Sequence, residues 1–330
     1  MGLHFYDDSP SGPFEQRGRL GPPLAITQAG IPCVVWAEDA LSIVHRVPTG
    51  LFDLQLLVPD DKVPESVGAL CASLPYHMIA DEDNETSHWR DMRQFNLDRP
   101  HAFKLGSTDT VVLSHVESSV ARTEEVPERI LVHRASTFHF DMNDTSRTML
   151  NPDPPDPAFA HLRFPTVSAF LDSMMDTLFE PPVPMQHMKF QMRLAVYRGY
   201  IVLYTISDKG IFSTDEHVLL PRILEVLDTI KEENRPNLIR RYLDLPCGGY
   251  EVCALERQAL KAARFEGLGL RYEPPMSIPY SPLTHRLGRP SPVIPELRQT
   301  PYLIRNHHNE LSIQWRALAR YTSAAAKLVR

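Results

Sequence analysis

The chain has 330 residues, of which 43% are hydrophobic and 23% charged, and its formal net charge is −7. This length corresponds to about two domains of about 150 residues each, and the composition is that of a globular protein, which excludes a largely disordered, collagen-like or coiled-coil chain. The net negative charge argues against nucleic-acid binding through bulk electrostatics. Thirty prolines against fifteen glycines indicate stiff, non-helical connecting segments.

Cysteine usage and the N-terminal sequence both bear on the compartment. Cys33, Cys71, Cys247 and Cys253 are too few and too scattered for a disulfide framework, so reduced thiols are the simplest interpretation. The first twelve residues lack the basic and apolar regions of a secretion signal, and no run approaches the roughly eighteen apolar residues that span a bilayer. These features favour a cytoplasmic protein without a membrane segment.

The first half of the chain predicts an arm followed by an α/β domain. Proline and glycine in residues 1–23 predict a disordered or extended arm, and residues 24–150 predict the domain. The residue pattern of the domain predicts, in chain order, a strand at Cys33–Trp36, a helix at Asp39–His45, a strand at Leu51–Val58, a helix at Pro64–Leu74, and strands at Thr110–Glu117, Arg129–Ser136 and Thr137–Asp141. The acidic stretch Asp81–Asp91 predicts a surface loop.

The second half predicts mainly helices. Four prolines in Asn151–Pro157 predict a linker, because proline ends helices and cannot pair in a central strand. Residues 158–273 predict a helical domain, since apolar residues there recur three and four apart, with helices at Thr166–Glu180, His187–Tyr204, Asp215–Glu233 and Glu251–Arg264. Residues 274–330 predict a proline-rich basic strap and a terminal helix at Glu310–Leu328.

The predicted fold class is therefore α/β (α+β): a mixed sheet with helices, followed by a mainly helical part and the strap. The aromatic and methionine side chains of the helical part predict a core, with the lining of an apolar pocket as the alternative. The segment from Thr284 to Arg330 contains eight basic and two acidic residues, so its net charge is +6, which leaves −13 for the rest of the chain. The basic segment either folds against the acidic body or binds an anionic ligand or partner.

The stretch Val34–Pro59 carries the most specific pattern. A predicted strand ends in Ala37-Glu38-Asp39-Ala40-Leu41, and the next strand reads Phe52-Asp53-Leu54-Gln55-Leu56-Leu57-Val58. This arrangement resembles the nucleotidyltransferase-fold superfamily, which includes DNA polymerase beta and the minimal and AbiE-type nucleotidyltransferases, and it is similar to uncharacterised fungal proteins with the same skeleton. The resemblance covers about thirty residues closely and, by architecture, about the first 150.

The resemblance implies a site for Mg²⁺ or Mn²⁺. In that family the second strand carries an Asp-x-Asp pair that holds the metal, and Asp53 matches its first carboxylate while the neutral Gln55 replaces its second. Asp53 and Gln55 share one strand face because side chains alternate with a period of two. A third acidic ligand would come from a later strand, where Asp141 is the candidate, with His139 beside it on the same face.

The turn after the first strand also departs from the family. A Gly-Ser turn would let backbone amides approach a triphosphate, whereas Ala37 and Glu38 bring a side chain and a negative charge, which repels phosphate. Glu38 and Asp39 either join Asp53 in a different metal geometry or serve as helix-capping residues that interact with the helix dipole. The sequence contains no C-x₂-C, H-E-x-x-H, G-x-S-x-G or P-loop motif, which argues against zinc, hydrolase and P-loop chemistry.

Two functions follow as hypotheses. The first is a nucleotidyltransferase-fold protein with an altered metal site, which binds a nucleotide or another small molecule or transfers a nucleotidyl group to an acceptor. The second is a catalytically inactive binding or scaffold protein that uses the basic strap, or an enzyme of different chemistry on the same fold. The sequence does not identify a substrate or an oligomeric state.

Overall fold

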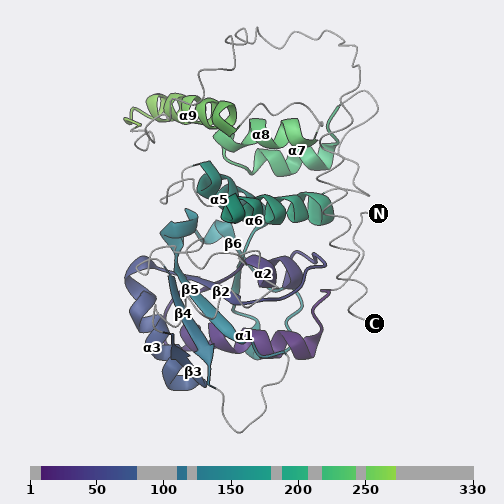
Figure 1. Cartoon of the computed structure of the whole chain (residues 1–330). Coiled ribbons are helices and arrows are strands. Elements are labelled where there is room, and N and C mark those ends of the chain that lie inside the picture. The colour runs from purple at the N-terminus through teal and green to yellow at the C-terminus, as the bar shows by residue number, and fades with distance from the viewer. Residues whose placement is uncertain are drawn as a thin grey trace. The chain divides into compact units, whose positions relative to one another are not determined.

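The computed structural model describes residues 9–79, 110–116, 125–179, 188–206, 218–242 and 250–272 (Figure 1). The chain divides into one compact unit, Met1–Ile278, and a second unit, Pro279–Arg330, so every described residue belongs to the first. The predicted acidic loop Asp81–Asp91, the strap and the terminal helix lie outside the described residues.

The strands alternate with helices in the first part of the chain and give way to helices in the second. The strands are β1 (Val34–Trp36), β2 (Leu54–Val58), β3 (Tyr76–Met78), β4 (Thr110–His115), β5 (Arg129–Arg134), β6 (Thr148–Leu150) and β7 (Arg163–Pro165). The α-helices are α1 (Pro13–Gln28), α2 (Ala37–Ile43), α3 (Val63–Ser73), α5 (Val167–Phe179), α6 (Met188–Tyr200), α7 (Pro221–Asp228), α8 (Arg235–Tyr242) and α9 (Tyr250–Gly267).

One mixed sheet of seven strands runs in the order β3-β4-β5-β2-β1-β7-β6, which confirms the α/β fold class. β2 pairs antiparallel with β1 and parallel with β5, so β2 lies in the middle of the sheet. All five residues of β2 and all three of β1 are buried, as expected of strands covered on both faces. The predicted order of strand, helix and strand at residues 33–58 is confirmed as β1, α2 and β2.

Residues 13–23 were expected to be part of an extended arm, and this expectation was wrong. They belong to α1, which begins with Pro13 and contains Pro22 and Pro23. A proline is tolerated in the first turn of a helix but removes a backbone hydrogen bond further in, so local propensity opposes this helix. Packing favours it instead: Leu20 and Ile26 are fully buried, and a Cβ at Gly18 would approach the backbone of Glu125 to 2.8 Å.

The predicted strand Thr137–Asp141 is also wrong. A 3-10 turn, η3 (Ala135–Phe138), follows β5 directly, and His139 then adopts a left-handed backbone with φ of 51°. Phe140 N–H donates to the carbonyl of Ala135 at 3.0 Å, which closes the turn. Alternating aromatic residues imitated a strand, but Phe138 and Phe140 both bury their rings against Trp36, each at 5.5 Å between centroids.

The segment Asn151–Pro157 was expected to be a linker between two domains. It joins β6 to the next strand, β7, and these two strands pair antiparallel in the same sheet, so the sheet extends beyond residue 150. Asn151 is buried and donates to the side chain of Gln16 in α1 at 3.3 Å. The prolines therefore shape a connection inside the compact unit.

The helical part packs on this sheet through α5. Phe170, Leu171, Met174 and Met175 of α5 are all buried, which confirms the predicted core face of this helix. The Phe170 ring lies 4.8 Å from that of Trp36, so α5 contacts the centre of the sheet. A π-helical turn, η6 (Ile201–Ile206), extends α6, and η7 (Glu232–Asn234) precedes α8. In the described part of the chain, every helix is too short or too polar to cross a membrane.

Candidate functional site

The turn from β1 into α2 contains Ala37 in a left-handed backbone conformation. Its φ is 54°, a region that favours glycine because a Cβ there crowds the backbone. The side chain of Ala37 is fully buried. Alanine holds this left-handed conformation at an energetic cost. Trp36, not Asp39, occupies the N-cap position of α2, while Glu38 and Asp39 lie in the first turn.

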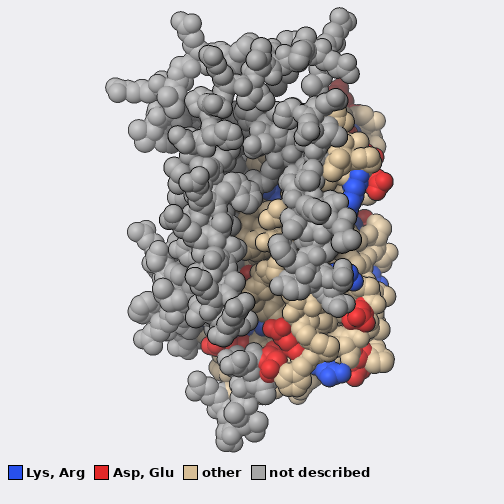
Figure 2. Space-filling view, turned by 90° about the vertical axis from the view of Figure 1, so that its right-hand side faces the viewer, with Lys and Arg blue, Asp and Glu red and all other residues tan. Residues whose placement is uncertain are grey.

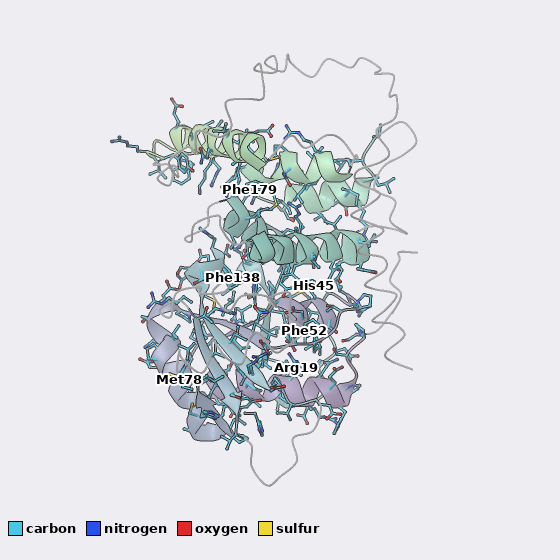
Figure 3. All side chains as sticks on the ribbon, viewed as in Figure 1. Arg19, His45, Phe52, Met78, Phe138 and Phe179 are labelled. Carbon is cyan, nitrogen blue, oxygen red and sulfur yellow. The ribbon has the colours of Figure 1, made fainter. Side chains whose placement is uncertain are left out.

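Asp39 forms a buried ion pair with Arg19 of α1. Arg19 Nε and Nη2 donate to the two carboxylate oxygens of Asp39, the second bond at 2.7 Å, and Nη2 also donates to the carbonyl of Phe52 at 2.9 Å. Figure 3 labels Arg19 and Phe52, which these contacts join. The Arg19 side chain is 5% exposed and that of Asp39 is 0% exposed. Burial raises the pKa of Asp39, and the Arg19 guanidinium opposes that rise.

Asp53 forms a second buried pair with Arg129. Arg129 Nε donates to Asp53 Oδ1 at 3.0 Å, and the two side chains are 4% and 7% exposed respectively. The sheet register explains the contact, because Leu54 of β2 lies beside Ile130 of the parallel strand β5, which places the preceding residues side by side. The carboxylate that the resemblance assigns to metal binding therefore contacts a guanidinium.

Gln55 and Glu38 contact each other. Gln55 Nε2 donates to Glu38 Oε2 at 3.1 Å, and both side chains are buried. Gln55 lies opposite Trp36 in the antiparallel pairing of β1 with β2, so it reaches the start of α2. α2 contacts α6, and the pKa of Tyr200 in α6 is raised by burial and further by the charges of Tyr204 and Glu38. Glu38 therefore lies within electrostatic reach of α6.

The structure brings four of the six candidate residues to the junction of β1, α2 and β2. His139 and Asp141 follow η3 in a turn, where the exposed Asp141 Oδ1 accepts a hydrogen bond from the backbone N–H of Asn143 at 2.9 Å. In the described ranges, no group of three or more His, Cys, Asp or Glu side chains converges as metal ligands. Asp53 is paired with an arginine, and the Asp141 carboxylate accepts a backbone hydrogen bond within a local turn. These residues therefore do not fit an Mg²⁺ or Mn²⁺ site of the type that the resemblance implies.

A second buried polar network holds the helices together, and the sequence did not predict it. Asp172 and Asp176 lie one turn apart on α5, and Asn234 donates to both carboxylates, at 2.9 and 3.0 Å. Lys231 Nζ and Arg257 Nη2 each donate to Asp176 at 2.6 Å. Although burial opposes it, these two cations lower the pKa of Asp176 to about 2, whereas burial raises the pKa of Asp172.

This network is explained by helix packing. It joins α5 to η7 and to α9, and Asn234 at its centre is fully buried. Buried charges are tolerated when they are paired and hydrogen-bonded, which each carboxylate here is. The sequence did contain a signal for this network. Asp172 and Asp176 are four residues apart in an otherwise apolar helix, so they lie on the same face of that helix.

The three cysteines that the structure describes are free thiols. Cys33 and Cys253 are buried, Cys71 is exposed, and Cys247 lies outside the described residues. Burial raises the pKa of the Cys33 thiol. Comparison of the chain with family models, with curated proteins and with solved structures gives no match.

Proposed function

We propose that this chain is a catalytically inactive, nucleotidyltransferase-like protein that acts by binding a partner. The observation that carries the proposal is the pairing of Asp39 with Arg19 and of Asp53 with Arg129. These carboxylates are the ones that the resemblance would give to nucleotide and metal. In our proposal they stabilise the junction of α1, α2 and β2 instead.

The chemistry of Mg²⁺ supports this assignment. Mg²⁺ requires nearly octahedral oxygen coordination and usually keeps several waters while it bridges carboxylates to phosphates. Glu38, Asp39, Asp53 and Gln55 are each at most 6% exposed. A hydrated ion and a triphosphate need open surface beside the carboxylates, and arginine side chains occupy that position for both aspartates.

The turn at Ala37 supports the same proposal. In a phosphate-binding turn, glycine lets backbone N–H groups approach the ligand without a side chain between them. Here a methyl group and the Glu38 carboxylate take that place, and the methyl is buried in the core. A negative side chain at the start of α2 interacts favourably with the helix dipole but repels a polyphosphate.

The partner surface that we propose is the basic segment Thr284–Arg330, with its charge of +6. This segment lies outside the described residues. On the described part of the face in Figure 2, basic and acidic side chains are interspersed. The positive charge of this segment favours a partner with clustered carboxylates. Such a partner and the nucleotides of the cell are both negatively charged, but a surface with many carboxylates competes better than single nucleotides do. We also propose that the protein is cytoplasmic.

The activity is tested by incubating the whole protein with labelled nucleoside triphosphates and Mg²⁺ or Mn²⁺. We expect no nucleotidyl product beyond that formed by the Asp53→Asn variant. A metal-dependent product that Asp53→Asn abolishes, in a variant whose circular dichroism spectrum is unchanged, would support nucleotidyl transfer by an altered site and overturn our proposal.

The binding function is tested on the same protein with polyglutamate as the acidic probe. We expect the Arg286→Glu/Arg289→Glu double variant to bind polyglutamate more weakly than wild type at low salt. The matched control is Arg17→Glu/Arg163→Glu, which reverses two exposed charges in the described body and should bind as wild type does. Equal losses in both variants would show that the charge of the whole chain, and not the basic segment, governs binding.

A further inference from the structure

His45 lies where the sheet meets the helical part. It follows α2, its side chain is 3% exposed, and its imidazole makes a hydrogen bond with the backbone of Pro165 at the end of β7. Because proline has no N–H, the bonding group is the Pro165 carbonyl and the imidazole is the donor. This bond links the segment after α2 to β7. Figure 3 labels His45 beside α6.

Two further contacts tie His45 to helices. Its ring meets Phe170 of α5 edge-on, with centroids 6.0 Å apart, and its backbone carbonyl accepts a hydrogen bond from Thr205 Oγ1 of η6 at 3.0 Å. Arg222 of α7 in turn donates to the carbonyl of Thr205 at 3.0 Å. His45 therefore contacts one strand of the sheet and two helical elements of the second half of the chain.

The other ring nitrogen of His45 restricts its protonation. Nε2 is buried and has no hydrogen-bond partner among the residues that the structure describes. In the neutral ring that donates to Pro165, Nε2 carries a lone pair and no proton. Adding a proton there would create a buried charge beside the Phe170 ring with no acceptor for the new N–H, which is strongly unfavourable.

Charged groups on the surrounding elements do not compensate this cost. Among the residues whose side chains the structure describes, the titratable groups on the elements around His45 are Glu38, Asp39 and Arg46 on and after α2, Arg163 on β7, Asp172 and Asp176 on α5, Tyr197, Arg198 and Tyr200 on α6, Tyr204 on η6 and Arg222 on α7. Arg198 donates to Asn237 at 3.0 Å, and Arg222 donates to the carbonyl of Thr205. Asp39 is paired with Arg19, and Asp172 and Asp176 are held by Asn234 and Lys231. Only burial and the Pro165 bond shift the His45 titration.

We propose that His45 is a proton-sensitive contact between the sheet and the helices α5 and η6, and that uptake of a solvent proton by its imidazole occurs only when these helices move away from it. The proton adds to Nε2, the ring becomes positively charged, and water then hydrates it. No other bond is made or broken. The device would loosen the helical part in acid while β2 and β5 stay folded.

The size of the effect follows from linkage. Burial lowers the pKa of His45 to about 4, although the bond to Pro165 opposes the shift, and the ordinary value is 6.5. The open state therefore binds more protons than the closed state between about pH 6.5 and pH 4, so opening becomes more favourable as the pH falls through that range. Between pH 7.5 and pH 5 the opening equilibrium constant should rise about 30-fold.

Amide hydrogen exchange of the whole protein at pH 7.5 and pH 5, corrected for intrinsic exchange rates, tests the proposal. We expect protection of α5 to fall about 30-fold at pH 5, with a much smaller change in β2 and β5. In His45→Gln, whose amide can still donate to Pro165, the roughly 30-fold loss of α5 protection at pH 5 should disappear, which leaves only the pH dependence of other groups such as Asp172. The control His161→Gln removes an exposed imidazole near β7 and should behave as wild type.

Two results would overturn the proposal. One is an unchanged pH dependence of α5 protection in His45→Gln, and the other is an equal loss of protection in α5, β2 and β5. If His45→Gln does not fold, a nuclear magnetic resonance titration of the wild-type histidines decides instead. An imidazole assigned to His45 that titrates near pH 6.5 in the folded protein contradicts the proposal, and one that stays neutral to below about pH 5 supports it.

Discussion

Replacing the Arg129 side chain should destabilise the protein strongly if the Asp53–Arg129 pair is structural. Arg129→Met keeps much of the side-chain volume but removes the guanidinium from beside a carboxylate that is 7% exposed. Breaking a buried ion pair by removing one partner costs about 3 to 5 kcal/mol. The expected result is a loss of that size in the free energy of unfolding, measured by urea denaturation at pH 7.5 with circular dichroism.

A double variant separates the charge effect from packing. Asp53→Leu/Arg129→Met replaces both charges by apolar groups, and such replacements are often neutral or stabilise a protein by about 1 to 4 kcal/mol when they pack well. The matched control is the exposed pair Lys62–Glu65, whose side chains are 39% and 57% exposed, and Lys62→Met should leave the urea midpoint unchanged. An Arg129→Met variant as stable as wild type would refute the structural role that we assign to this pair.

Three further perturbations test other parts of the structure. Ala37→Gly should leave stability within about 1 kcal/mol of wild type by urea denaturation, because relief of the left-handed backbone offsets the lost methyl, whereas Ala37→Val should cost more than about 2 kcal/mol. Asp176→Asn should flatten the pH dependence of stability between about pH 4 and pH 2, where the wild type loses about 2 kcal/mol as the paired carboxylate is protonated; an unchanged acid limb would contradict this. Cys71→Ser should remove one equivalent from the fast phase of thiol labelling in the folded protein, and a variant that labels like wild type would show that Cys71 is not accessible.

The strand and helix pattern of residues 33–74 could be predicted because its elements carry local sequence signals, although the polar residues Glu38, Asp39 and Asp53 are also buried there. The mostly apolar sequence of β2, interrupted only by Gln55, and the three-and-four spacing of α3 are local signals, and the structure confirms both elements. The helix α1 could not be predicted in this way. Its prolines oppose a helix locally, and it is stabilised by contacts with distant residues, such as Arg19 with Asp39.

The candidate site was predicted in part for the same reason. Glu38, Asp39, Asp53 and Gln55 come together because they lie at adjacent ends of paired elements, which the chain order already implied. Their partners Arg19 and Arg129 were missed, since nothing local connects them to these residues. A signal did exist for Arg129. Arg129 begins one predicted strand and Asp53 lies at the start of another, and when two such strands pair in parallel their N-terminal ends lie side by side.

The prediction for Asp141 failed at the level of backbone conformation. Alternation of aromatic and polar residues in Thr137–Asp141 satisfies the period of a strand, but the same alternation fits a turn that buries two aromatic rings on one side. The left-handed backbone of His139 reverses the chain between them. A third acidic ligand at the sheet therefore depended on a strand that does not form.

Binding of Mn²⁺ in the presence of ATP tests the central claim most directly, because it needs no knowledge of an acceptor. Electron paramagnetic resonance of free Mn²⁺, compared with a protein-free sample at the same ATP and Mn²⁺ concentrations, reports the ions that the whole protein binds beyond those that ATP chelates. We expect wild type and Asp53→Asn to bind Mn²⁺ identically, because in our account Asp53 forms an ion pair with Arg129 and does not bind metal. A stoichiometric Mn²⁺ site in wild type that Asp53→Asn removes without unfolding would contradict it.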